Sequence, residues 1–182
     1  MSRTIEEIIN DIINTEGGYV DNKNDRGGKT NYGITEEVAK SNGFNGDMRD
    51  LPVQFAQSIY YKQYVCDPMF DKIFLLSPEV AAELVDTGVN MGPKTSSAFF
   101  QRALNLFDKN GELYEPLKVD GSIGSATILA FRNYLANRKD KAVPVMLKAL
   151  NCLQGNRYIE LAEANATQKT FVFGWLANRV EI

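Results

Sequence analysis

Two carboxylates, Glu16 and Asp25, lie within a glycine-rich segment near the start of the chain, TEGGYVDNKNDRGGKTNYGIT (15–35). Glu16 is followed by two glycines, and Asp25 comes nine residues after Glu16. Cleavage of a glycosidic bond needs one acid to protonate the leaving oxygen and a second group to act as a nucleophile or to activate water. We therefore interpret Glu16 as a candidate general acid and Asp25 as a candidate for the second role, with Thr30 able to help hold a water molecule.

The residues before Glu16 predict the element that positions it. Isoleucines with helical spacing form one apolar face between Ile5 and Ile13. Glu16 follows Ile5 by three turns plus about 20°, so it belongs to the same face and lies in the last turn. Partial burial and the negative end of the helix dipole both disfavour an ionised carboxylate, which suits a general acid. The alternative is a glutamate that extends into water.

Glycines and tyrosines lie among and after the two carboxylates. Gly27, Gly28 and Gly33 permit tight turns and leave room for a sugar to approach the backbone. Tyr19 and Tyr32 offer flat faces to pyranose rings, with packing in the core as the alternative for each.

Composition excludes several other chemistries. The chain of 182 residues has no histidine, which removes Ser-His-Asp and Cys-His nucleophile systems and histidine-containing zinc sites. A net charge of −3 argues against a nucleic-acid partner, and no apolar run is long enough for integral membrane association. Segments 21–25 and 108–112 lack the ligand pattern of a calcium loop. We therefore expect no metal and no cofactor, and we expect Cys66 and Cys152 to be buried thiols, without deciding whether they ever pair.

The pattern is helical along most of the chain. Thr4 and Glu7 form a potential capping box, and Tyr19–Val20 is expected to pair with residues 31–35 as a short hairpin. Ser77 and Pro78 predict a helix start, and 108–124 is predicted to be a loop. Further helices are expected at 50–64, from 95 or 96 to 107, and at 125–137, 140–154, 155–165 and 169–180. In the helix at 50–64, at least one of Tyr60, Tyr61 and Tyr64 must be exposed.

Longer motifs match a known family. The segment EGGYVDNKNDRGGKTNYGIT closely resembles the opening signature of glycoside hydrolase family 108, the phage and bacterial muramidases related to phage-type lysozymes. AQSIYYKQY (56–64) resembles the tyrosine-rich helix of that family. VDTGVNMGPKTSSAFFQRALN (85–105), VDGSIGSATILAF (119–131), CLQGNRYIELA (152–162) and FGWLANRV (173–180) resemble its C-terminal peptidoglycan-binding half and closing helices.

The resemblance implies a fold and a site. The expected fold is mainly α, a lysozyme-like two-lobed helical fold with a small β-hairpin after the first helix. A catalytic lobe at 1–93 and a peptidoglycan-binding-like helical lobe at 94–182 would pack as one compact unit. The catalytic glutamate of the family falls on Glu16, and the carboxylate spacing of phage-type lysozymes falls on Asp25. Thr30 is one residue closer to Asp25 than the family threonine, and Val65 stands where the family often has tryptophan.

The implied activity is hydrolysis of the β-1,4 bond between N-acetylmuramic acid and N-acetylglucosamine in peptidoglycan. The candidate substrate-binding residues are Tyr19, Tyr32, Tyr61, Asp86 and Asn90. A lytic transglycosylase and a non-catalytic peptidoglycan-binding module are the alternatives. We expect a monomer that is made in the bacterial cytoplasm without a signal peptide and reaches the wall through a holin or a dedicated export route.

Three other residues have predominantly structural interpretations. Trp175, the only tryptophan, lies in a closing apolar stretch and is expected in the core. Arg157 and Arg179 are expected to pair with acidic side chains.

Overall fold

The structure is a computed structural model that describes residues 3–21 and 29–180. It is mainly α-helical with one small sheet, as the sequence predicted. The helices of its first half are α1 (Ile5–Glu16), α2 (Glu36–Ser41), α3 (Val53–Tyr61) and α4 (Phe70–Phe74), with a 3-10 turn at Met48–Asp50 and a π-helix at Lys62–Cys66. The helices of its second half are α5 (Pro78–Met91), α6 (Pro93–Phe107), α7 (Ser125–Arg138), α8 (Ala142–Ala164) and α9 (Lys169–Arg179), with 3-10 turns at Lys139–Lys141 and Ala166–Gln168.

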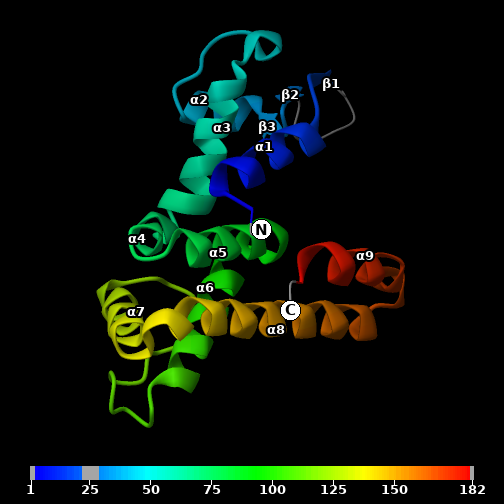
Figure 1. The fold of residues 1–182 in the computed structure, drawn as a ribbon. Coiled ribbons are helices and arrows are strands. Elements are labelled where there is room, and N and C mark those ends of the chain that lie inside the picture. Colours follow the sequence, from blue (N-terminus) through cyan, green and yellow to red (C-terminus); the bar gives the residue numbers. More distant parts are fainter. Residues whose placement is uncertain (1–2, 22–28, 181–182) are drawn as a thin grey trace.

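The helices form two groups that meet at α5 (Figure 1). α1, α2, α3 and the sheet lie on one side of α5, and the long α8 with α6, α7 and α9 lies on the other. α5 packs against α1 as well as against α6 and α8. One continuous cluster of buried residues runs from Ile5 in α1 to Leu150 in α8, so the two groups share a core.

Local signals explain where α1 begins and ends. The Glu7 N–H donates to Thr4 Oγ1 at 3.2 Å, and the Thr4 N–H donates to Glu7 Oε2 at 2.7 Å, which confirms the capping box. The isoleucine face is buried, at Ile5, Ile8, Ile9 and Ile13. Gly17 ends the helix with φ +75°, a backbone conformation that favours glycine.

The sheet contains three short antiparallel strands, β1 (Val20–Asp21), β2 (Lys29–Asn31) and β3 (Ile34–Thr35). The hairpin after the first helix is therefore confirmed, but Val20 pairs with Thr30, just outside the segment expected to be its partner. β2 turns directly into β3, since Asn31 pairs with Ile34 across two residues. Those two residues are Tyr32 with φ +52° and Gly33 with φ +72°, the pair of positive φ angles that a type I′ hairpin turn requires.

Helix starts in the middle of the chain follow capping and proline signals. Ser77 caps α5 by accepting a hydrogen bond from the Val80 N–H, and Pro78 occupies the first turn, as predicted. α6 begins at Pro93, before the expected start at Thr95 or Ser96, because proline is already suited to the first helical position after Gly92. The loop at 108–124 is confirmed.

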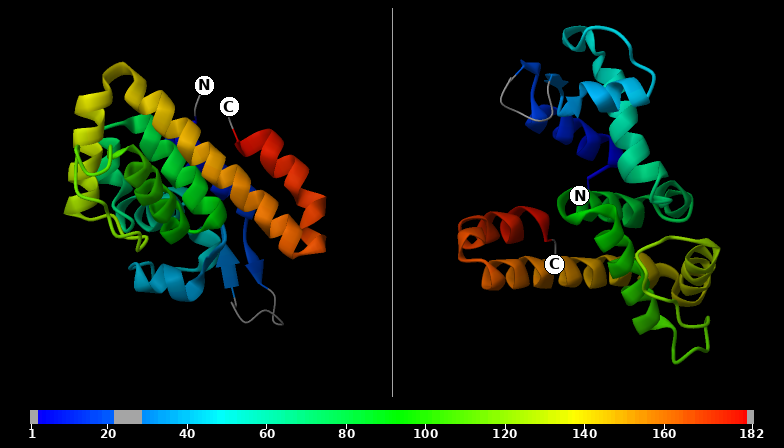
Figure 2. Two further views of the ribbon diagram at one scale, coloured as in Figure 1. Left: turned by 90° about the horizontal axis from the view of Figure 1, so that it is seen from below. Right: turned by 180° about the vertical axis from the view of Figure 1, so that it is seen from behind.

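The largest difference from expectation lies in α8. The predicted boundary between residues 154 and 155 is wrong, since α8 runs unbroken for 23 residues. Gly155 is buried inside it, and a Cβ built there would lie 3.6 Å from Val180 and 3.8 Å from Leu176. The C-terminal segment packs near Gly155, and Figure 2 shows it lying alongside α8.

Three predictions of burial are also wrong. Trp175 is only half-buried and stacks between Tyr158 and Phe171, with ring centroids 5.1 and 6.1 Å away, because α9 lies on the surface of α8. Cys66 and Cys152 are exposed free thiols, since each lies on an outward face of its helical segment.

Candidate active site

Glu16 is the last residue of α1, as its spacing from Ile5 predicted, but it is exposed. The prediction of partial burial is therefore wrong. The apolar face of α1 is covered only as far as Ile13, and the chain turns away at Gly17, so the Glu16 carboxylate extends past the edge of the core. No basic residue lies in the last turn of α1, so the negative end of the helix dipole faces Glu16 without a cation from its own helix.

The β2–β3 turn packs against the Glu16 side chain. A Cβ built on Gly33 would lie 2.8 Å from Glu16 Oε2 and 2.9 Å from Glu16 Cγ, closer than non-bonded carbon atoms approach each other. The same Cβ would lie 2.6 Å from the Tyr60 hydroxyl oxygen. Gly33 is thus required for two reasons, its positive φ and the space that Glu16 and Tyr60 occupy.

Tyr60 connects α3 to this turn. Its hydroxyl donates a hydrogen bond of 2.8 Å to the Tyr32 carbonyl oxygen. Burial of the ring and the nearby negative charge of Glu16 raise the pKa of Tyr60 to about 12. Tyr60 therefore stays a neutral hydrogen-bond donor at physiological pH and holds the turn beneath Glu16.

Tyr64, one turn later, completes an aromatic wall. Its ring stacks on that of Tyr60 with centroids 6.2 Å apart and an interplanar angle of 16°. Burial and the charge of Glu16 also raise the pKa of Tyr64. The sequence required at least one of Tyr60, Tyr61 and Tyr64 to be exposed, and Tyr61 is. Tyr60 and Tyr64 both pack near Glu16, and their spacing of four residues was the available signal.

The sheet carries two of the other candidate residues. Thr30 is half-buried in the middle strand, paired with Val20 on one side and Thr35 on the other. Tyr19 is half-buried just before β1, where its hydroxyl donates to Asp21 Oδ2 at 3.3 Å and the Arg49 guanidinium lies 5.1 Å from its ring centroid. Asp25, with Gly27 and Gly28, lies outside the described residues.

The remaining candidates lie apart from Glu16. Tyr61 is 45% exposed and lines a groove between α1 and α3 that Glu16 does not line. Asp86 on α5 accepts hydrogen bonds of 3.0 Å from Arg3 and from Arg179. Asn90 donates to the Asp86 carbonyl oxygen at 2.7 Å. Asp86 thus joins the start of α1 to α9, and Asn90 supports it.

The predicted pairing of the two arginines with acids is confirmed. Arg179 bonds to Asp86, and Arg157 forms an exposed ion pair of 3.1 Å with Glu160. Within residues 3–21 and 29–180, the acidic and cysteine side chains form no group of three or more that could hold a metal ion. None of the helices in that part of the chain has the length and apolar character to cross a bilayer.

The first helix thus ends in an exposed carboxylate that lies against a β-turn and two tyrosines in a mainly helical fold. Residues 9–92 match the model of the family described as glycosyl hydrolase 108, and residues 95–180 match that of a predicted peptidoglycan domain. These two matches support a glycosyl hydrolase 108 half followed by a peptidoglycan-domain half, and they confirm the resemblance seen in the sequence.

A solved structure has a similar fold. The structure of Brucella abortus SagA aligns with a TM-score of 0.56 and 23% sequence identity, over 94% of this chain and 87% of that one. This likeness concerns the fold. Comparison with curated proteins found no match.

Proposed function

We propose that this protein is an N-acetylmuramidase that hydrolyses the β-1,4 bond between N-acetylmuramic acid and N-acetylglucosamine, with Glu16 as the general acid. The observation that carries the proposal is the packing of the Glu16 carboxylate against Gly33 beside the Tyr60 hydroxyl. The turn and the buried tyrosine limit on one side where the carboxylate can lie, and positioning of the acid is what general acid catalysis requires. The family of the first half, a glycosidase family, supports the same role.

Glu16 is exposed in the free protein, so its surroundings change when a glycan binds. The protein core does not desolvate this carboxylate, so the bound glycan must do so by covering it and displacing water. The half-buried ring of Tyr64, which stacks on the buried Tyr60, provides an uncharged surface against which a sugar ring can close the site.

Asp25 is proposed to position or activate water on the opposite face of the sugar, with Thr30 assisting. Thr30 belongs to β2, whose start lies four residues after Asp25 in the sequence, so the segment carrying Asp25 joins β1 to β2. Asp25→Asn should lower turnover by about 10²-fold or more, the scale on which acid–base groups act, with little change in melting temperature. Near wild-type turnover would assign the water-handling role to another group.

Peptidoglycan is the proposed partner of both halves. The proposed catalytic lobe is 1–93 and the proposed peptidoglycan-binding lobe is 94–182, a division that the limits of the two family matches support. Tyr19 and Tyr32 are proposed to contact the glycan from the sheet side of Glu16. We further propose that the protein acts as a monomer at the cell wall.

The test is the release of reducing ends from purified peptidoglycan by wild type and by Glu16→Gln. Glutamine keeps the size of the side chain but cannot donate a proton in the same way, so cleavage should fall by about 10² to 10⁴-fold. Because Glu16 is exposed, the melting temperature should stay unchanged. Glu37→Gln, an exposed glutamate on α2, is the matched control and should retain activity.

Product analysis separates the alternatives. A hydrolase yields reducing N-acetylmuramic acid, whereas a transglycosylase yields anhydro-muramoyl products without a reducing end. Binding of peptidoglycan without any cleavage by the wild type would indicate a non-catalytic module. Wild-type cleavage by Glu16→Gln would refute the assignment of the acid.

A further inference from the structure

A second hollow lies along α1 and α3, away from Glu16. It has a volume of about 910 Å³, within the range of roughly 300–1,000 Å³ typical of small-molecule sites. Along α1 it extends from Arg3 to Asn10, whereas Glu16 lies six residues, or about 9 Å, further along the helix. We call this hollow the α1–α3 groove.

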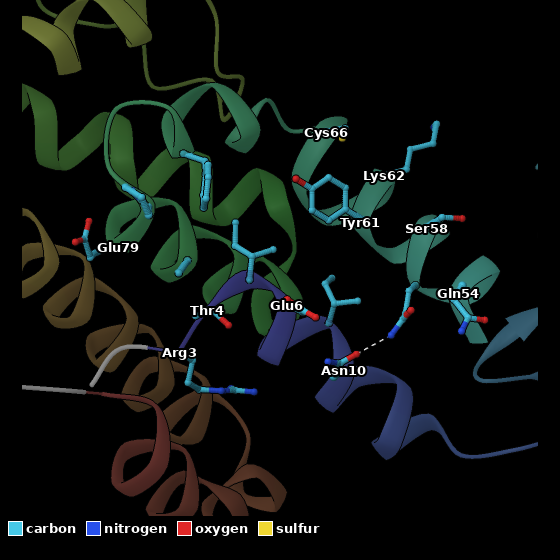
Figure 3. Close-up of a pocket in the computed structure, with 16 residues that line it drawn as sticks. Arg3, Thr4, Glu6, Asn10, Gln54, Ser58, Tyr61, Lys62, Cys66 and Glu79 are labelled. Atoms are coloured by element: carbon cyan, nitrogen blue, oxygen red, sulfur yellow. Dashed lines mark hydrogen bonds between the residues drawn. The ribbon is translucent and has the colours of Figure 1, made fainter. Parts of the chain in front are cut away.

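The groove has a largely apolar surface with neutral polar side chains along both helices and a few charged residues among its lining. Buried Ile5, Ile9 and Ala82 contribute to its base. Gln54, Ser58 and Tyr61 lie along α3, and Glu6 and Asn10 lie along α1 on the facing side (Figure 3). Apolar surface with a few polar groups at fixed positions is the usual composition of a ligand site.

One hydrogen bond across the groove orients two amides. Gln57 Nε2 donates to Asn10 Oδ1 at 2.7 Å, drawn as a dashed line in Figure 3. This bond leaves the Asn10 amide N–H₂ as a donor and the Gln57 carbonyl as an acceptor toward a ligand. A fixed donor beside a fixed acceptor complements hydroxyl and acetamido groups, which donate and accept together.

The charges around the groove favour a neutral ligand. Arg3 is bonded to Asp86 and to Asp11, and Lys62 Nζ lies 3.0 Å from Asp67, so both cations already have anionic partners. Glu6 is exposed on the α1 side and would repel a carboxylate or a phosphate. An acidic stem peptide is therefore a poor occupant.

Tyr61 supplies the aromatic face. It is 45% exposed on the groove side of α3, whereas its neighbour Tyr60 is buried toward Glu16. Successive helical residues differ by about 100°, so the two tyrosines lie on different faces of α3. An exposed ring between amide side chains suits a sugar, whose two faces are apolar and whose edge is polar.

We propose that the α1–α3 groove is a second binding site for a neutral, N-acetylated oligosaccharide, distinct from the site of Glu16. The choice of ligand rests on the proposed function, since an N-acetylated glycan strand is the polymer that the enzyme would cleave. The groove would hold one part of a strand while another part lies at Glu16, which raises the local concentration of substrate.

The test is calorimetric titration of the Glu16→Gln protein with chitotetraose, a neutral oligomer of N-acetylglucosamine. Two binding events per chain are expected. Tyr61→Ala combined with Gln57→Ala should remove the groove event or weaken it by about tenfold or more, as expected when an aromatic anchor is truncated. Phe173→Ala, which truncates an 81% exposed aromatic residue on α9, is the matched control and should retain both events.

Further measurements separate the possible outcomes. On the unaltered groove, NMR shifts caused by chitotetraose should include the side-chain amides of Asn10 and Gln57, a result that does not depend on the folding of a variant. Free stem peptide should cause no such shifts. Unchanged binding by a folded Tyr61→Ala/Gln57→Ala variant, or binding of the peptide in preference to the sugar, would overturn the proposal.

Reducing-end release and chitotetraose binding distinguish a failure of the groove proposal from a failure of the catalytic proposal. If only the groove is wrong, reducing ends are released in a Glu16-dependent manner while the groove variant binds sugar normally. If only the catalytic proposal is wrong, no reducing ends appear while chitotetraose still binds through Tyr61 and Gln57.

Discussion

Replacing Gly33 by alanine tests the arrangement around Glu16 with a single methyl group. The new Cβ would meet the Tyr60 hydroxyl at 2.6 Å and the Glu16 carboxylate at 2.8 Å, so both groups, or the turn itself, must move. Both contacts involve the far ends of side chains rather than backbone. The exposed Glu16 side chain can rotate away at small cost, whereas Tyr60 is buried and bonded to the Tyr32 carbonyl oxygen.

The expected magnitudes differ for stability and for activity. Alanine at φ +72° costs about 1–2 kcal/mol in the left-handed region, and loss of the Tyr60 hydrogen bond adds about 1 kcal/mol. For a chain of this size the melting temperature should fall by roughly 4–12 °C. Displacement of an acid by about 1 Å can cost about 10²-fold in rate, so activity should fall far more than the folded fraction at assay temperature.

The matched control is Gly111→Ala. Gly111 has φ +87° and lies in the loop at 108–124, where a new Cβ would meet nothing within 4 Å. The control should therefore show the backbone cost of about 1–2 kcal/mol with full activity. Thermal denaturation and reducing-end release measured on both variants separate strain from misplacement of the acid.

One result would refute the proposed role of the β2–β3 turn in positioning Glu16. If Gly33→Ala is as stable as Gly111→Ala and cleaves peptidoglycan at the wild-type rate, the packing of Glu16 against the turn is not the catalytic arrangement.

Three other perturbations follow from the structure. Tyr60→Phe should lower the free energy of unfolding by about 1 kcal/mol. Burial and Glu16 raise the pKa of Tyr60 from 10.0 to about 12, so between these values the unfolded chain releases the proton first and wild-type stability should fall as pH rises. In denaturant titrations across this pH range, the stability of the variant should fall less steeply. Asp86→Asn weakens the two charge-assisted bonds made by a side chain that is only 13% exposed. The free energy of unfolding measured by chemical denaturation should fall by about 1–3 kcal/mol. Glu160→Gln, which breaks an exposed ion pair, should change it by less than about 1 kcal/mol. Gly155→Ala should raise the free energy of unfolding by about 0.5–1 kcal/mol, because the added methyl meets its neighbours at ordinary contact distances of 3.6 Å or more; a loss of stability would show that the C-terminal segment packs more tightly.

Several features could be read from the sequence because neighbouring residues encode them. The capping box of Thr4 and Glu7 and the isoleucine spacing predicted α1, and Ser77 with Pro78 predicted the start of α5. The absence of histidine and the glycine-rich motif around Glu16 pointed to carboxylate chemistry and to the family. These signals act within a few residues, so they do not depend on how the helices pack.

Other features depend on contacts between residues distant in sequence, and only the tertiary structure decided them. Glu16 shares the apolar face of α1 but is exposed, because the elements that cover Ile13 do not extend to the end of the helix. A helix boundary was expected between residues 154 and 155, but Gly155 lies inside α8, where Val180 and Leu176 of the C-terminal segment pack near it. Periodicity predicts which residues share a face of a helix, but what covers that face is determined by elements elsewhere in the chain.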